Sequence, residues 1–253
     1  MSTFKDHFSR LAATYAAYRP VQPLAVLEWA ASLVPRRAVA WDCATGNGQA
    51  ACGLAPFFDR VIATDASAAQ IAQATPHARV EYRVAPAEAS GLADASVDLV
   101  SVAQALHWFD LDAFYREVRR VLAPGGALAV WSYMDPHVVD VPDVDAAFGR
   151  FAYGTLGAYW PPERRLVEEG YRTVAFPFDE VAAPPFDLTV RWTLDELAGY
   201  LRSWSATARY VDAHGADPVA TFVDEVRGTW GDAEMRHAIR WRYAIRAGYV
   251  ATD

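Results

Sequence analysis

Strand-type and helix-type segments alternate along the chain up to residue 133. Short apolar runs typical of buried strands occupy residues 39–41, 60–65, 80–84, 97–103 and 127–133. Amphipathic spacing typical of helices occupies residues 4–18, 23–33, 67–75 and 112–122. Such alternation predicts parallel strands joined by right-handed crossovers, with helices on both faces of the sheet.

The rhythm changes after residue 133, where prolines break the chain into short pieces. Thr193, followed by Glu196, predicts a capped helix at residues 193–205. A further helix is expected at residues 218–230 and a closing strand at 237–245. The whole pattern predicts an α/β fold with a Rossmann-like, mostly parallel seven-stranded sheet, helices on both faces and a helical cap from the C-terminal half.

Residues 39–51, VAWDCATGNGQAA, run from a strand through a turn of small residues into a helix. Glycine is needed where the backbone approaches a ligand closely or takes a positive φ. Gly46 and Gly48, with Ala51, match the dinucleotide fingerprint G-x-G-x-x-A. Taken alone, this match also fits a tight turn that holds no ligand.

Two carboxylates change the interpretation of this turn. Asp65 ends the next strand, where its side chain can accept hydrogen bonds from ribose hydroxyls. Asp42 directly precedes the turn, and two like charges ~4 Å apart repel by about 4 kcal/mol at an effective dielectric near ~20. A carboxylate there disfavours a pyrophosphate and attracts an ammonium or a sulfonium. The turn is therefore predicted to hold a cationic nucleoside.

Four motifs follow one another in the order found in class I S-adenosylmethionine-dependent methyltransferases. Residues 42–48 resemble the first motif of that family, and residues 65–67 resemble its ribose-binding motif. The similarity continues through residues 87–88 with 96–100, and through 121–126 before the fifth strand. The resemblance implies S-adenosyl-L-methionine as the cofactor.

Three further stretches resemble the trans-aconitate methyltransferase-like branch, which carries a methyltransferase type 11 domain: residues 15–20, 104–110 and 200–205. The resemblance covers nearly the whole chain. We expect an N-terminal helical lid at residues 1–35 and a cofactor-binding core at 36–135. Cap helices and closing strands of the same sheet are expected at 136–253.

The resemblance assigns cofactor roles to matching positions. Gly46 and the backbone around Ala44 approach the methionine part of the cofactor. Asp65 takes the ribose hydroxyls, while Ala66 and the Ala87 amide meet the adenine. The expected cofactor-binding residues are Asp42, Ala44, Gly46, Asp65, Ala66, Ala87, Glu88 and Gln104.

The chain departs from the family pattern at two positions. Ala44 stands where glycine is commonest, and its methyl group fits there if φ is negative. Pro86 stands where many relatives carry an acidic residue for the adenine amino group, which leaves that contact in doubt.

Methyl transfer requires that the donor and the acceptor be aligned and that water be excluded. A general base is needed only if the acceptor carries a proton that must be removed. His107 follows the fourth strand and is the candidate base, although a histidine there also serves as a hydrogen-bonding pocket wall. Arg19 and Tyr18 end the first helix, where a guanidinium can hold a carboxylate. Weaker acceptor-pocket candidates are Trp108 and Tyr133, with Trp204 and Ser205.

Composition limits the remaining possibilities. The net charge of −8 disfavours nucleic-acid binding, and no run approaches the ~18 apolar residues of a membrane helix. Cys43 and Cys52 have no metal-ligand spacing, so no metal is expected, and reduced thiols are typical of a cytoplasmic protein. We expect a monomer or a homodimer. The resemblance to the trans-aconitate methyltransferase-like branch implies O-methylation of a small carboxylic acid. An NAD(P)-dependent oxidoreductase and a non-catalytic cofactor-binding protein remain as alternatives.

Overall fold

A computed structural model describes residues 22–250, so the helix expected at residues 4–18 lies outside the described part. The centre of the fold is one sheet in the order β3-β2-β1-β4-β5-β8-β6, with β7 also pairing with β8. Its strands are β1 (Val39–Cys43), β2 (Arg60–Asp65), β3 (Val80–Val84), β4 (Val97–Ala103), β5 (Leu122–Val138), β6 (Asp179–Val181), β7 (Asp187–Trp192) and β8 (His237–Tyr249).

The Rossmann-like fold class is confirmed, but the expected number of strands was wrong, because residues 22–250 form a sheet of eight strands instead of seven. Strands β1 to β5 pair in parallel, whereas β8 runs antiparallel to β5, β6 and β7. The additional strand is accommodated by β8, which spans 13 residues and is long enough to pair with two short strands. Residues 247–249 of β8 pair with β6, and residues 237–242 pair with β7, so one strand serves two short partners.

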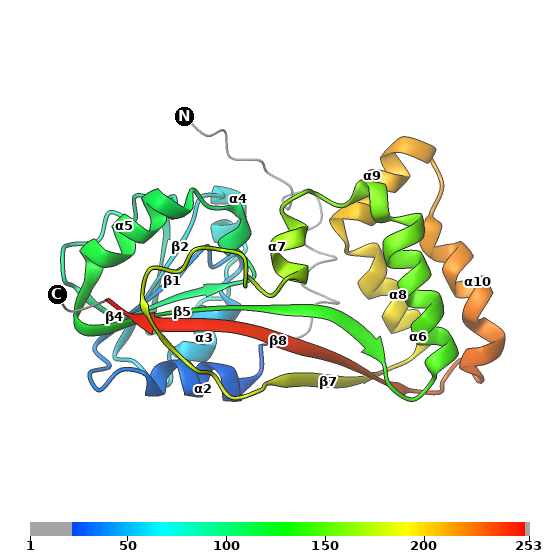
Figure 1. The fold of residues 1–253 in the computed structure, drawn as a ribbon, viewed down its shortest axis with the longest axis horizontal. Helices are drawn as coiled ribbons and strands as arrows, with labels where there is room; N and C mark the ends of the chain where they lie inside the picture. Colours follow the sequence, from blue (N-terminus) through cyan, green and yellow to red (C-terminus); the bar gives the residue numbers. More distant parts are fainter. Residues whose placement is uncertain (1–21, 251–253) are drawn as a thin grey trace.

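Helices cover both faces of the sheet (Figure 1). The apolar side of α5 packs on one face, and α2 and α3 pack on the other. The α-helices are α2 (Leu24–Ser32), α3 (Gln49–Leu54), α4 (Ala68–Ala72), α5 (Leu111–Val121), α6 (Pro142–Gly149), α7 (Arg164–Glu168), α8 (Leu194–Arg202), α9 (Ser205–His214) and α10 (Pro218–Trp230). Short helical turns are η1 (Leu106–Trp108), η2 (Arg150–Thr155) and η3 (Gly157–Tyr159).

The C-terminal half builds a second hydrophobic core at the far end of β5 and β8 (Figure 1). Both strands run on from the parallel sheet into this region, where α6, α8, α9 and α10 pack. The predicted capping box is present, because the Thr193 hydroxyl accepts from the Glu196 amide and the Glu196 carboxylate accepts from the Thr193 amide. The helix ends at Arg202, earlier than predicted, and α9 begins separately after the extended residue Trp204.

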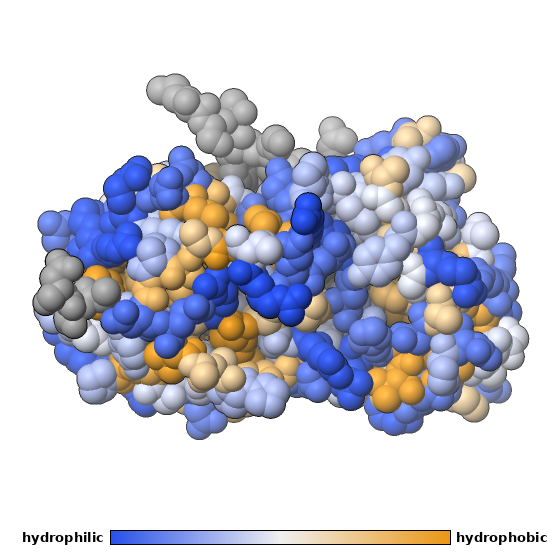
Figure 2. All heavy atoms as spheres, viewed as in Figure 1, coloured by the Kyte–Doolittle hydropathy of each residue, from blue (hydrophilic) through white to orange (hydrophobic). Residues whose placement is uncertain are grey.

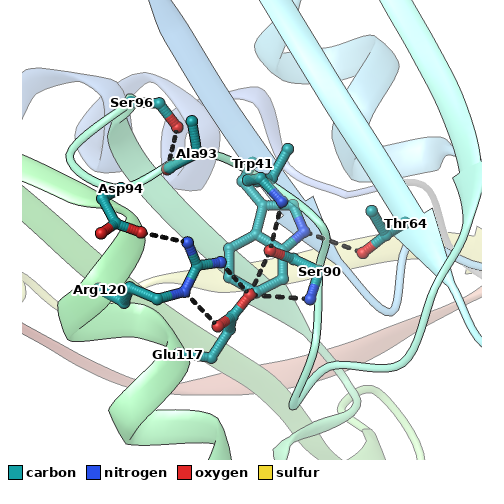
Figure 3. Close-up of polar contacts among 9 residues, drawn as sticks. Trp41, Thr64, Ser90, Ala93, Asp94, Ser96, Glu117 and Arg120 are labelled. Carbon is teal, nitrogen blue, oxygen red and sulfur yellow. Dashed lines mark hydrogen bonds and ion pairs between the residues drawn. The ribbon is translucent and has the colours of Figure 1, made fainter.

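Polar contacts join two strands of the sheet and hold one of its loops against a helix (Figure 3). The Trp41 indole donates to the Thr64 hydroxyl at 2.8 Å and so links β1 to β2. Glu117 of α5 accepts from both the amide and the hydroxyl of Ser90, at 2.8 and 2.5 Å. Arg120 bridges Glu117 to Asp94, so the loop between β3 and β4 is held against α5.

The surface in the view of Figure 2 is mainly hydrophilic, and its hydrophobic residues form several separate groups. Among residues 22–250, no helix combines the length and apolar character needed to cross a membrane.

Candidate active site

The loops after β1, β2, β3 and β4 enclose one cavity of about 730 Å³. It lies where the strand order changes direction, with β2 on one side of β1 and β4 on the other, which is the usual ligand position in open α/β sheets. All eight residues expected at the cofactor line this cavity: Asp42, Ala44, Gly46, Asp65, Ala66, Ala87, Glu88 and Gln104. Their individual contacts with the cofactor stay predictions.

The turn after β1 takes positive φ at Ala44, Gly46 and Gly48, with values of 54°, 58° and 90°. The negative φ that would have accommodated the Ala44 methyl group is therefore not found. A left-handed conformation costs a residue with a side chain about 1–2 kcal/mol. The cost is offset locally, because the next amide, that of Thr45, donates to the Thr64 carbonyl at 2.9 Å. Strain of this kind is concentrated at functional sites.

Asp65 holds the turn itself as well as facing the cavity. One carboxylate oxygen accepts from the Gly46 amide at 2.9 Å, and the other accepts from the Ser67 amide at 2.8 Å. The Ser67 hydroxyl in turn accepts from the amide of Gln70 and caps α4. Sequence reasoning gave Asp65 only a ligand role, and the structure adds the support of the loop.

Asp42 is buried, at 1% exposure, directly below the turn. Its two oxygens accept from the Thr45 hydroxyl at 2.5 Å and the Ser101 hydroxyl at 2.7 Å. Burial raises the pKa of Asp42 to about 6, with the Asp65 charge acting in the same direction and the two hydroxyls opposing it. The carboxyl is therefore ionised at neutral pH in a dry environment, where its attraction for a cation is strong.

The other end of the cavity is closed by the loop after β3. Pro86 lines it next to Ala87, which is buried. The Glu88 carboxylate accepts from the Asp110 amide at 3.1 Å, and Asp110 caps α5 by accepting from Ala113. Asp110 also lines the cavity and was missed by sequence reasoning, although its place before a helix is a recognisable capping signal.

A smaller recess of about 100 Å³ shares Gln104, His107 and Trp108 with the main cavity. Three acceptor-pocket candidates line it as well: Tyr133, Trp204 and Ser205. The structure adds polar and aromatic neighbours that the sequence did not indicate: Asp135, Trp160, Arg164 and Tyr200. Tyr18 and Arg19 lie outside the described residues.

His107 lies at the junction of the cavity and the recess. One ring nitrogen, Nδ1, forms a hydrogen bond of 2.9 Å with the hydroxyl of the buried Tyr171. Burial, with a contribution from the charge of Arg164, lowers the pKa of His107 to about 4. The imidazole is therefore neutral at physiological pH. It is also a weak base, because a protonated ring with so low a pKa readily loses its proton.

Gln104 takes a positive φ of 60° at the end of β4. Its carbonyl oxygen accepts from the Ser132 hydroxyl of β5 at 2.9 Å. Its buried Nε2 makes no hydrogen bond within residues 22–250. A buried amide with an unused donor requires a partner, and Gln104 lines both the cavity and the recess.

The fold and this site define an α/β enzyme that binds a nucleoside cofactor at the switch point of its sheet. A family profile described as a methyltransferase domain matches residues 41–130. A Dictyostelium discoideum protein named as a methyltransferase is 31% identical over 240 residues, which cover 92% of this chain and 90% of that protein. This chain belongs to the class I S-adenosylmethionine-dependent methyltransferases.

Two further similarities agree with this family. A solved methyltransferase structure from Anaeromyxobacter dehalogenans has 47% sequence identity and a TM-score of 0.87, covering 94% of this chain and 100% of that chain. The Saccharomyces cerevisiae protein CRG1, named as an S-adenosylmethionine-dependent methyltransferase, is 29% identical over 51% of this chain and 48% of that protein. The oxidoreductase alternative is set aside by this result.

The site fits S-adenosyl-L-methionine, the cofactor of the family. The cavity of about 730 Å³ lies within the usual range of small-molecule sites, ~300–1,000 Å³. The ionised Asp42 suits a ligand with an ammonium and a sulfonium, and Gly46, which lines the cavity without a side chain, leaves room for close approach of the ligand to the backbone.

Proposed function

We propose that the enzyme methylates a small organic acid on a carboxylate oxygen, as its resemblance to the trans-aconitate methyltransferase-like branch implies. One observation carries the proposal, namely the recess that joins the cofactor cavity through Gln104, His107 and Trp108. A recess of about 100 Å³ suits a small acceptor, and its aromatic walls exclude water from the reacting atoms.

The weakness of His107 as a base supports a carboxylate acceptor. General base catalysis is most effective when the pKa of the base lies near the working pH, and the pKa of His107 is lowered to about 4. A hydroxyl or ammonium acceptor requires removal of a proton, whereas a carboxylic acid with a pKa near ~4 arrives already ionised. We infer that His107 orients the acceptor and forms the wall of the junction.

The chain's own residues hold the cofactor and align the acceptor. We propose that Asp42 attracts the positive charge, Asp65 binds the ribose, and Ala66 and Ala87 contact the adenine. The bound cofactor supplies an electrophilic methyl group, so that a C–O bond forms as the S–C bond breaks and no proton moves. Alignment at the junction then provides most of the rate enhancement.

The test is a screen of carboxylic acids, phenols and amines with S-adenosylmethionine, with detection of S-adenosylhomocysteine and of the methylated product. We expect methyl esters. The H107A variant should keep turnover of the best acid within about tenfold of wild type, since a base contributes ~10²–10⁴-fold where one is needed. Methylation of phenols or amines but not acids would refute the acid proposal, as would loss of a hundredfold or more in H107A.

The remaining assignments are also proposals. The net charge of −8 supports an acceptor other than nucleic acid. We propose a cytoplasmic monomer or homodimer, with the division into lid, core and cap at residues 1–35, 36–135 and 136–253.

A further inference from the structure

Arg164 is held rigidly at the wall of the recess by three interactions. Its guanidinium lies 3.6 Å from the centre of the Trp160 ring. Its Nε donates to Glu168 at 2.9 Å, one helical turn further along α7, and its Nη2 donates to Asp135 of β5. The side chain is only 16% exposed, so its position is set by packing and pairing rather than by solvent.

These contacts leave one end of the guanidinium unused. Arginine carries five N–H donors, and the bonds to Glu168 and Asp135 use two of them. Within residues 22–250, the hydrogen bonds of Arg164 come from Nε and Nη2, and none comes from Nη1. Another unused donor, the Nε2 of Gln104, belongs to the same recess. The recess therefore offers donors that no oxygen of residues 22–250 accepts from.

The charge of Arg164 acts on His107, which lines both the recess and the cofactor cavity. After burial, Arg164 is the cause of the lowered pKa of His107, and no described carboxylate acts on that pKa. Two carboxylates pair with the guanidinium: Glu168, which is 35% exposed, and Asp135, which is 19% exposed. Because Asp135 and Glu168 occupy Nη2 and Nε, the Nη1 group is the part of the guanidinium that is available to an anion in the recess.

We propose that Arg164 binds the carboxylate of the acceptor through Nη1, and that Trp160 and Trp204 contact an apolar body of the same molecule. The substrate class is a small carboxylic acid with a flat or apolar body. One carboxylate oxygen accepts from Arg164, which leaves the other oxygen for the methyl group. This inference rests on the proposed function, because it requires an acid acceptor.

The test compares the binding of benzoate with that of neutral benzamide, measured by calorimetry on the complex with S-adenosylhomocysteine. Wild type should prefer benzoate. R164Q should lose about 10- to 100-fold in benzoate affinity, the value of a hydrogen bond to a charged group, with little change for benzamide. R164K keeps the charge and loses the planar fork, and should fall between the two.

Arg165 provides a matched control on the same helix. It is 79% exposed, pairs with Glu169 and does not line the recess, so R165Q should bind benzoate as wild type does. Unchanged affinity for S-adenosylhomocysteine shows that a variant is folded, and R164K replaces R164Q if R164Q is not.

Three results would overturn the role of Arg164: equal affinity of wild type for benzoate and benzamide, undiminished benzoate affinity in R164Q, or parallel loss of both ligands. The acid proposal is tested separately, by methyl ester formation. If wild type makes methyl esters and R164Q has the same KM for the acid, only the role of Arg164 fails.

Discussion

The substitution D42N tests the buried charge below the cofactor turn. The carboxyl of Asp42 has a pKa of about 6 in the folded protein against an ordinary value of 3.8, chiefly because burial disfavours its ionised form. The folded state therefore binds this proton more tightly than the unfolded state. As a result, ionisation of Asp42 destabilises the folded protein: the destabilisation is absent below pH 3.8 and grows as the pH rises to about 6. Asparagine is neutral throughout, so the variant lacks this effect.

The magnitude follows from the shift. Raising the pKa of Asp42 from 3.8 to about 6, at about 1.4 kcal/mol for each tenfold change in proton affinity, gives roughly 3 kcal/mol of destabilisation in wild type at pH 7.5. About 2 kcal/mol of this develops between pH ~4.5 and ~7.5. Changes in the hydrogen bonds from Thr45 and Ser101 affect the variant at every pH, so the difference between the two pH values isolates the charge.

The assay is urea unfolding of wild type and D42N at both pH values without cofactor. The stability of D42N relative to wild type should increase by about 2 kcal/mol from the acidic to the neutral condition. Adding S-adenosylmethionine at neutral pH should reverse the order, because only wild type offers the anion and a tightly bound ligand raises stability. Parallel pH dependences of the two proteins would show that Asp42 is not ionised in a dry site.

Asp65 and Gly48 provide two further tests. D65A should weaken S-adenosylmethionine binding at least about 100-fold, as measured by calorimetry. The substitution removes the expected ribose partner and both hydrogen bonds that Asp65 accepts from the turn. Undiminished affinity would eliminate the ribose assignment. G48A should lower the free energy of unfolding by about 2 kcal/mol or more, since φ is +90° and the new Cβ lies 2.1 Å from the Tyr82 hydroxyl. G149A is the matched control, because a Cβ there meets nothing within 4 Å; equal urea midpoints for the two variants would contradict this reasoning.

The sequence determined the parallel half of the fold and the position of the cofactor cavity. Strands and their connections leave local signals, in apolar runs, in the glycine turn and in the capping box at Thr193. Once strands are parallel, their carboxyl ends meet at one edge of the sheet, so Asp42, Asp65 and Gln104 had to lie near one another. Their convergence follows from topology and needs no knowledge of packing.

Only the tertiary structure decided the recess and the electrostatics of the site. Arg164 and Asp135 are 29 residues apart in the sequence, and His107 and Tyr171 are 64 apart, so no local pattern indicates either pair. The positive φ at Ala44 and the raised pKa of Asp42 depend on burial and on neighbours from other strands. Pairs between residues far apart in the sequence form only when the chain packs, so the sequence does not reveal them. The strand-to-helix turn, in contrast, is indicated by its own neighbouring residues.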